Sequence, residues 1–260
     1  MRVLLGRVVV IFLAFGLTAG IANAADLTAG LVAFWPMNGN AVDATGNGHD
    51  GTVNGAQFVQ DAERGTVLSV NGSNAFVEVD HADDIAFTDV AGATMSLALW
   101  VKPAVAPNPG WHTILVKNRD VHYDNSFGLW QNTGYYHFRF GNRTFNADDL
   151  ATDEWKLLVL TYDGPSTTMK GYVNNQLINT IAQNPGSLGE STLMIGAARN
   201  HEGAHSPFEF FAGLIDDVAI YNRVLDQAEI DDLAGGEKIS LTAVEPEHKL
   251  ATTWGTVKRH

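Results

Sequence analysis

Residues 210–225 read FFAGLIDDVAIYNRVL. The stretch is apolar and strand-like, yet it carries two adjacent carboxylates, Asp216 and Asp217. Charge that is buried without a partner is costly, so another group must compensate these two acids. A hard cation is the simplest such group, because carboxylate, amide and carbonyl oxygens are the ligands that Ca²⁺ prefers. The segment therefore predicts a strand that ends a folded domain and shares in a cation site.

A second oxygen-rich segment lies far upstream, where residues 43–51 read DATGNGHDG. It supplies two aspartates, an asparagine and flexible glycines, which together suit a loop that wraps around a hard cation. If this loop meets the late strand in space, the two segments tie the beginning and the end of one domain together.

The first residues predict export. Residues 1–24 begin with Arg2 and Arg7, continue through an apolar run at 8–17 and end in Ala-Asn-Ala, the small-x-small pattern that signal peptidase reads. The alternative is a membrane anchor, but the run is shorter than the roughly 20 residues that a spanning helix needs and no second run follows. We expect cleavage before Ala25 and a mature chain that is secreted, periplasmic or at the cell surface, with no membrane span.

Composition limits what the mature chain can be. The remaining length fits one large β domain, predicted here at residues 25–236, followed by a tail or edge strand at 237–260. The chain has no cysteine, so burial, alone or together with a metal, must hold an exported fold together without disulfides. The net charge of −13 argues against nucleic acid or an anionic membrane as the main partner.

The local patterns predict an all-β, two-sheet antiparallel sandwich. Short apolar or alternating runs recur with turn residues between them, and the nearly continuous apolar runs at 96–101 and 157–160 predict central strands. The pair Asn174-Asn175 predicts a tight hairpin across residues 169–181, because asparagine tolerates positive φ. One short peripheral helix is expected after Asp226, with Glu229 completing a capping box.

Six ordered blocks carry a family resemblance: residues 31–40, 43–52, 96–103, 155–164, 171–175 and 211–225. In this order they resemble laminin-G-like, concanavalin A-like jelly-roll domains, over nearly the whole mature chain. The resemblance implies two curved antiparallel sheets, frequently a structural calcium ion between the first loop and the last strand, and recognition of carbohydrate or protein outside cells. Lectins, adhesion modules and glycoside hydrolases share this scaffold, so function must be argued from the site.

The resemblance also implies a set of calcium ligands. They are side-chain oxygens and backbone carbonyls of Asp43, Gly46, Asn47, Gly51 and Asp216 or Asp217. The alternative is an Asx-turn at Asp43 and a carboxylate pair that accepts hydrogen bonds from backbone amides. Consecutive strand residues face opposite ways, so Asp216 and Asp217 are not expected to bind one ion together.

Catalytic patterns are weak, and no catalytic residue is predicted. Glu78-Val79-Asp80 approaches the Glu-x-Asp-x-x-Glu strand of laminarinase-like relatives, but Asp83 stands where the final glutamate belongs and the segment lies too early in the chain. An edge strand with solvated acids explains it better. His201 and His205 are a poor transition-metal pair, because their loop has no thiol or third histidine nearby.

Binding residues are better supplied. Between residues 111 and 139, aromatic side chains alternate with amides and charged groups, the groups that stack on sugar faces and bond hydroxyls. We predict ligand contacts from four residues expected in loops, Trp111, Tyr123, Asp124 and Asn125. Trp130 and Tyr136 fit core packing at least as well.

The sequence thus favours a calcium-stabilised recognition domain that binds a glycan or an extracellular protein without catalysis. The alternatives are a glycoside hydrolase or polysaccharide lyase on the same scaffold, and a structural or adhesive component of a surface assembly.

Overall fold

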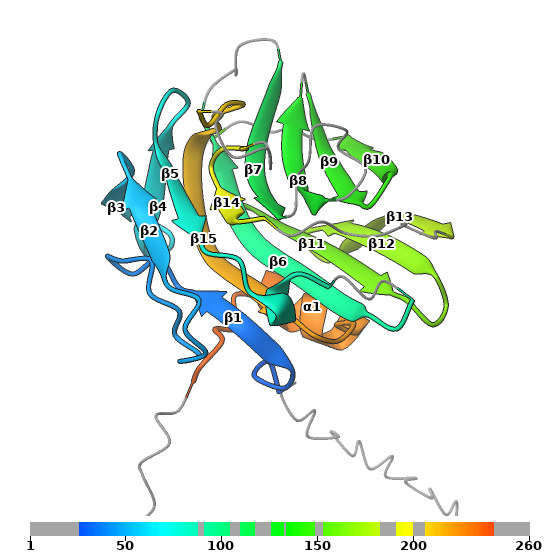
Figure 1. The fold of residues 1–260 in the computed structure, drawn as a ribbon. Coiled ribbons are helices and arrows are strands. Elements are labelled where there is room, and N and C mark those ends of the chain that lie inside the picture. The colour runs from blue at the N-terminus through cyan, green and yellow to red at the C-terminus, as the bar shows by residue number, and fades with distance from the viewer. Residues whose placement is uncertain are drawn as a thin grey trace, which may run out of the picture.

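The structure is a computed structural model that describes residues 26–87, 91–104, 110–117, 126–132, 134–148, 153–182, 191–199 and 206–241. These residues form two layers of antiparallel strands with a single α-helix in the described part (Figure 1). The predicted all-β sandwich is therefore confirmed. The predicted signal segment and residues 242–260 of the tail lie outside the described residues.

The first sheet has eight strands in the order β13-β12-β11-β6-β15-β4-β3, with β1 also paired to β15. Its strands are β1 (Leu31–Trp35), β3 (Gln57–Asp61), β4 (Gly65–Asn71), β6 (Thr94–Pro103), β11 (Lys156–Asp163), β12 (Thr168–Val173), β13 (Gln176–Ala182) and β15 (Ala212–Tyr221). The two apolar runs of the sequence form β6 and β11, which pair with each other in the middle of the sheet as predicted.

The second sheet has seven strands in the order β10-β9-β8-β7-β14-β5-β2. They are β2 (Gly51–Asn54), β5 (Phe76–Val79), β7 (Trp111–Lys117), β8 (Phe127–Asn132), β9 (Tyr135–Phe140), β10 (Arg143–Asp148) and β14 (Leu193–Ile195). A 3₁₀ turn, η1 (Asp83–Ile85), follows β5. In Figure 1, β7 to β10 lie in the upper part of the molecule, with β11 to β13 beneath them.

The main core lies between the two sheets. Phe140 of β9 stacks on Tyr162 of β11 with ring centroids 4.1 Å apart, so the layers interdigitate through aromatic rings. Gly171 of β12 faces Phe145 of β10 so closely that an added Cβ would lie 2.4 Å from the ring. Alternate residues of β8, β9 and β10 are committed to this core, which leaves the residues between them on the outer face.

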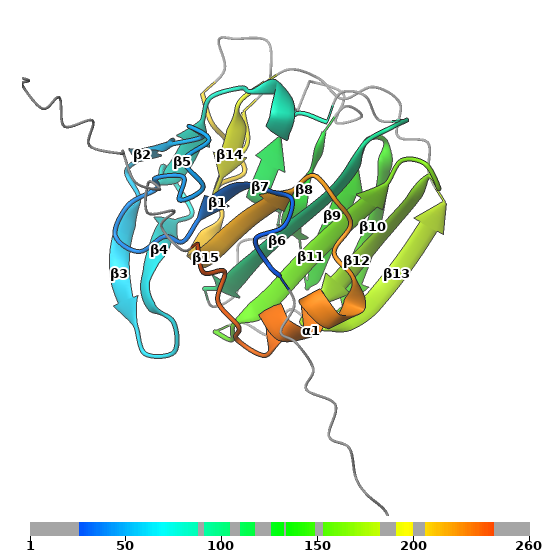
Figure 2. The same ribbon diagram turned by 90° about the horizontal axis from the view of Figure 1, so that it is seen from below.

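Two local predictions are confirmed in detail. The hairpin between β12 and β13 turns at Asn174, whose φ is 54°, a conformation that asparagine adopts more readily than most residues. The helix α1 (Gln227–Ala234) begins at Asp226, and Asp226 and Glu229 form the reciprocal capping box. Ile230 and Leu233 pack α1 against the outer face of the first sheet (Figure 2). No helix of the described residues combines the length and hydropathy needed to cross a bilayer.

The alternation expected at Asp216 and Asp217 is wrong. The pairing of β15 with β6 shifts register between Asp216 and Ala219, and Asp217 has φ of 46°. This irregularity is a β-bulge, in which an extra residue breaks the strict alternation of side chains. Both carboxylates consequently reach the same neighbouring side chain, that of Arg64.

Candidate functional site

The outer face of strands β7 to β10 gathers aromatic and polar side chains. Pairing places Thr113, Trp130, His137 and Asn146 opposite one another in a row across the four strands. Neighbouring rows of the same face add further side chains. We define the aromatic face as Trp111, Trp130, Tyr135, His137, Arg139 and Thr144.

The aromatic face has a buried floor between two exposed rings. Trp130 is 3% exposed and His137 is 7% exposed, whereas Trp111 is 45% and Tyr135 43% exposed. The ring centroids of Trp111 and His137 are 4.4 Å apart, and those of Tyr135 and His137 are 6.4 Å apart. Among the described residues, Trp111 and Tyr135 are the large aromatic side chains that remain exposed. Exposed apolar groups that are clustered in this way mark binding surfaces.

A small pocket opens within the aromatic face. It has a volume of about 40 Å³ and is lined by Trp111, Trp130, His137, Arg139 and Thr144. Burial lowers the pKa of His137 from 6.5, and the nearby Asn146 side chain and Asn132 backbone only partly oppose this effect. Both ring nitrogens are buried and have no hydrogen-bond partner within the described residues. The imidazole is therefore neutral near pH 7, and the pocket floor carries no charge.

The chain segment before β15 holds the neighbouring part of this sheet face. The backbone N–H of Thr113 donates to the Glu209 carbonyl at 2.7 Å, and a ring nitrogen of His112 lies 2.8 Å from the Phe210 carbonyl. Phe208 and Phe210 pack onto an outer cluster that includes Trp130. Trp130 is thereby buttressed from one side, while the described part of the aromatic face stays accessible from Trp111 to Tyr135.

Asp216 and Asp217 of β15 both form ion pairs with Arg64. Arg64 Nε lies 2.8 Å from Asp216 Oδ2, and Arg64 Nη2 lies 2.5 Å from Asp217 Oδ2. The guanidinium also stacks 4.3 Å from the ring centroid of Trp100. Burial and then the charge of Asp217 raise the pKa of Asp216 to about 7, against the opposing effect of Arg64. Asp216 Oδ1 is buried and has no hydrogen-bond partner in the described part of the chain.

The loop of residues 43–51 is organised around Asp43. Asp43 Oδ1 accepts hydrogen bonds from the backbone N–H groups of Phe34 at 3.1 Å and Thr45 at 3.0 Å, and Oδ2 accepts from that of His49 at 3.2 Å. Asn47 Nδ2 donates to the Val32 carbonyl at 2.7 Å. The bond from the Thr45 N–H to Asp43 Oδ1 forms the Asx-turn that the sequence offered as the alternative to a metal ligand.

Among the predicted calcium ligands, Asp43 and Asn47 form hydrogen bonds with the backbone around their own loop, whereas one oxygen of Asp216 has no partner within the described residues. Gly46 adopts a φ of 79° and Gly51 donates its N–H to the Ala41 carbonyl, so both belong to the turn geometry of the loop. Within the described ranges, no group of three or more histidine, aspartate or glutamate side chains is arranged to hold a metal. The unpartnered oxygen of Asp216 fits a cation ligand, and calcium stays a prediction.

The other predicted residues have mixed outcomes. Trp111 lies on the aromatic face, but the expectation that it lies in a loop is wrong, because it is the first residue of β7 and pairs with Asn132. Tyr123, Asp124 and Asn125 lie outside the described residues, as do His201 and His205.

For Trp130 and Tyr136 the sequence left both core packing and ligand contact open. Tyr136 lies in the core between the sheets, and Trp130 lies on the outer face. Thr144 was not predicted as a binding residue from the sequence, because only the pairing of β9 with β10 brings it beside Arg139. His137 and Arg139 belonged to the alternating pattern but could not be distinguished from their neighbours.

The edge-strand prediction for Glu78 is wrong. Its strand, β5, lies between β14 and β2, so it is internal to the second sheet. Glu78 is not solvated but paired, because Arg199 Nη1 lies 2.5 Å from Glu78 Oε1. Asp80 follows the end of β5, so the two acids do not share a strand.

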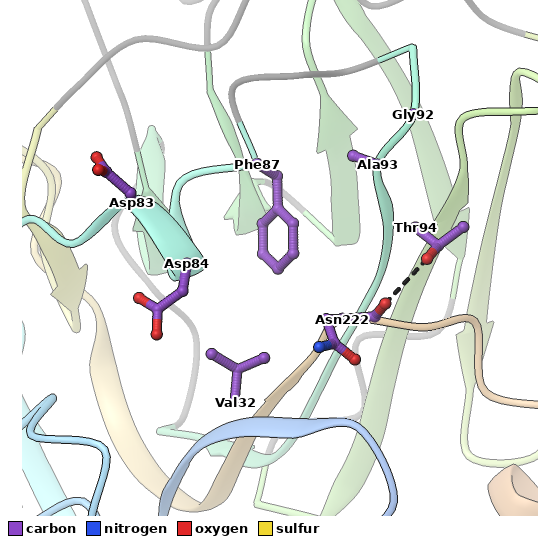
Figure 3. Close-up of a pocket in the computed structure, with 8 residues that line it drawn as sticks. All are labelled: Val32, Asp83, Asp84, Phe87, Gly92, Ala93, Thr94 and Asn222. Atoms are coloured by element: carbon purple, nitrogen blue, oxygen red, sulfur yellow. Dashed lines mark hydrogen bonds between the residues drawn. The ribbon is translucent and has the colours of Figure 1, made fainter.

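A second, larger cleft of about 440 Å³ lies at the end of β15. Its lining consists of Val32, Asp83, Asp84, Phe87, Gly92, Ala93, Thr94 and Asn222. Figure 3 shows the Phe87 ring reaching into the cleft above Val32, with Asp84 and Asn222 on opposite sides. Asp84 is engaged with His49 Nε2 at 3.1 Å. The cleft is open and has one aromatic ring, so the aromatic face is the stronger candidate.

Comparison with known proteins agrees with this fold. The laminin G family model described as the concanavalin A-like lectin/glucanases superfamily matches residues 71–231, more than half of the chain. The protein therefore belongs to this family. No curated protein matches the chain significantly.

Solved structures with the same fold include domain 4 of AbnA, a GH43 extracellular arabinanase from Geobacillus stearothermophilus, in complex with arabinotriose. It is 21% identical with a TM-score of 0.59, and the match covers 78% of this chain and 98% of that domain. The binding domain of botulinum neurotoxin serotype D/C is 14% identical with a TM-score of 0.61, covering 80% of this chain and 52% of that one. The binding domain of botulinum neurotoxin DC in complex with rat synaptotagmin II is 16% identical with a TM-score of 0.59 and coverages of 80% and 52%. This chain thus spans about half of the neurotoxin binding domains, and these identities show a shared fold alone.

Proposed function

We propose that this protein is an exported recognition domain that binds carbohydrate on its aromatic face and performs no chemistry on it. The observation that carries the proposal is the pair of exposed rings, Trp111 and Tyr135, on either side of the buried Trp130 and His137. Such rings offer flat apolar platforms to the C–H faces of sugars, and their polar edges accept or donate hydrogen bonds to hydroxyls.

The neighbouring polar groups suit the same ligand. Asn146 and Thr144 are exposed on β10 beside the aromatic floor, and both can bond sugar hydroxyls. Among the structures of the same fold, the AbnA domain was solved with arabinotriose and a neurotoxin study names two gangliosides, whereas another neighbour was solved with synaptotagmin II. The aromatic platform favours the glycan over the protein as the partner of this chain.

The absence of catalysis is supported by the composition of the site. Hydrolysis of a glycosidic bond generally requires two carboxyl groups that flank the bond. None of the described residues that line the pocket is a carboxylate. Glu78, which the sequence suggested as a weak catalytic candidate, forms an ion pair with Arg199 on a different part of the sheet.

The experiment is a panel of soluble polysaccharides and oligosaccharides tested by affinity electrophoresis and calorimetry. We expect retention without release of reducing ends, and we expect Trp111→Ala to lose at least about tenfold in affinity because it removes a stacking platform. Leu177→Ala is the matched control, since Leu177 is equally exposed but lies on β13 of the other sheet.

The possible results separate the three functions. Release of reducing ends would support a hydrolase, and neither retention nor release would support a structural or adhesive component. Equal affinity in wild type and Trp111→Ala would remove the aromatic face from the proposal.

Export and calcium stabilisation are further parts of the proposal. Export is supported by the charged, apolar and small-residue regions of residues 1–24. Calcium is supported by the family resemblance of the loop at Asp43 and by the buried, unpartnered oxygen of Asp216.

A further inference from the structure

We infer that the small pocket of the aromatic face receives one methyl group of the bound sugar, so that the ligands are glycans with methyl-bearing substituents, above all N-acetylated hexosamines. The inference rests on the proposed function and specifies the ligand class of the same site. A methyl group could come from the acetamido group of an N-acetylhexosamine or from C6 of a 6-deoxyhexose, and the experiment separates these sources.

The first argument is size. The pocket has a volume of about 40 Å³. An apolar cavity of about 150 Å³ accommodates benzene, so this pocket has room for about one or two heavy atoms. A sugar ring cannot enter it, but a single methyl substituent can. The ring itself then remains outside, at the level of Trp111 and Tyr135.

The second argument is the chemistry of the walls. Three of the five lining residues, Trp111, Trp130 and His137, are aromatic, Arg139 and Thr144 complete the lining, and burial keeps His137 neutral. A hydroxyl or ammonium group that entered such a pocket would lose hydrogen bonds to water without full replacement. A methyl group loses none and gains dispersion contacts with the rings. The pocket therefore selects for a methyl group and against the hydroxyl of an unsubstituted sugar.

The third argument is the polar rim. Thr144 lines the pocket, and Asn146 lies two residues further along the same face of β10, opposite His137. Their hydroxyl and amide groups match the N–H and carbonyl that flank an acetamido methyl. The C6 methyl of a 6-deoxyhexose brings no such amide, so the rim favours the acetamido group.

The experiment compares four trisaccharides by calorimetry: N-acetylglucosamine trimer, glucosamine trimer, glucose trimer and a trimer of the 6-deoxyhexose rhamnose. We expect the N-acetylglucosamine trimer to bind at least about fourfold more tightly than the glucose trimer, because one methyl group is removed from water. The glucosamine trimer controls for the loss of the acetyl group, and the neutral glucose trimer controls for attraction between an amine and this acidic chain.

A variant tests the pocket itself. Thr144→Ile keeps a β-branched residue on an exposed strand position but fills the space, so it should abolish the preference for the acetylated trimer over the glucose trimer. Thr52→Ile on β2 is the matched control, because Thr52 is also an exposed threonine of the second sheet. Thermal melting of both variants checks that they fold.

Preference for the rhamnose trimer alone would support the methyl pocket with a 6-deoxyhexose as its source. Equal affinities across the panel, an unchanged preference in Thr144→Ile, or no binding of any of the four trimers would overturn the inference. The proposed function fails separately, when the broader glycan panel shows no binding that depends on Trp111.

Discussion

Arg64 is the residue that makes the doubled aspartate of β15 tolerable. It lies 152 residues before Asp216, so nothing in the local sequence identifies it as the partner. Its guanidinium contacts both carboxylates and the face of Trp100, which a planar, delocalised cation does better than an ammonium. Because the pair is largely buried, removal of one side should matter far more than for a surface ion pair.

Replacement of the cation tests this view. Arg64→Met should lower the free energy of unfolding at pH 8 by about 3 kcal/mol, because it leaves two carboxylates unpaired in a partly buried position. Urea denaturation measures the change. Arg143→Met, at an exposed arginine of β10, should change stability by less than about 0.5 kcal/mol. A loss of the same small size in both variants would show that Arg64 is not the compensating group.

The raised pKa of Asp216 predicts a pH dependence. Burial raises the pKa from 3.8 in the unfolded chain to about 7 in the fold, so the folded state binds more protons between these values. The stabilisation that Asp216 contributes through its raised pKa is fully present below about pH 4 and is lost as pH rises through about 7. We measure the free energy of unfolding in EDTA from pH 5 to 8. In wild type it should fall with pH more steeply than in Asp216→Asn, by up to about 1.4 kcal/mol for each pH unit. Parallel curves for the two proteins would contradict the assignment.

At the scale of elements, signals within a few residues of one another specify the hairpin and the helix. Asn174 can take positive φ at the turn between β12 and β13, and Asp226 with Glu229 begins α1. The bulge at Asp217 has no comparable signal, because an apolar run with two acids reads the same whether its side chains alternate or slip by one residue. Residues close together in the sequence therefore predicted where the helix begins and where the hairpin turns. They did not predict the bulge, because pairing with a neighbouring strand sets its geometry.

The helix cap gives a measurable prediction at this scale. Asp226 Oδ1 accepts from the Glu229 N–H at 2.9 Å, so Asp226→Ala should lower stability by about 1 kcal/mol in urea denaturation. Asp231→Ala removes an exposed aspartate from the same helix, together with its bond to Gln227, and should lower stability by a few tenths of a kcal/mol at most. Similar losses in the two variants would mean that the cap has no special role.

At the scale of the whole molecule, two sheets close around one core and bring the first loop and the last strand into one layer. Strand β1, which precedes the Asp43 loop, pairs with β15, and Trp35 stands opposite Val218. The beginning and the end of the domain are thus joined by a strand ladder and by Arg64, whatever calcium adds. One core of buried side chains runs between the two sheets across the described residues, and the domain bounds 25–236 stay a prediction.

Thermal unfolding with and without calcium tests whether the ion stabilises the fold. If calcium binds the folded state alone, the midpoint of thermal unfolding should rise between EDTA and millimolar calcium, by an amount that grows with the ratio of calcium to its dissociation constant. Asp43→Ala should lose this response, whereas Asp163→Ala, at the last residue of β11, should keep it. Because Asp43 also organises its loop, the informative quantity is the calcium response and not the melting point itself. Identical midpoints with and without calcium in wild type would remove the ion from the proposal.

The all-β class, the central strands β6 and β11, the hairpin at Asn174 and the cap of α1 could be predicted from the sequence, because each depends on residues that are close together in the chain. Tertiary structure alone decided that Arg64 holds Asp216 and Asp217, that Trp130 faces outward while Tyr136 faces the core, and that Thr144 joins Trp111 around one pocket. These contacts depend on strand register between segments far apart in the chain. A slip of one residue exchanges the two faces of a strand, and no local pattern carries that information.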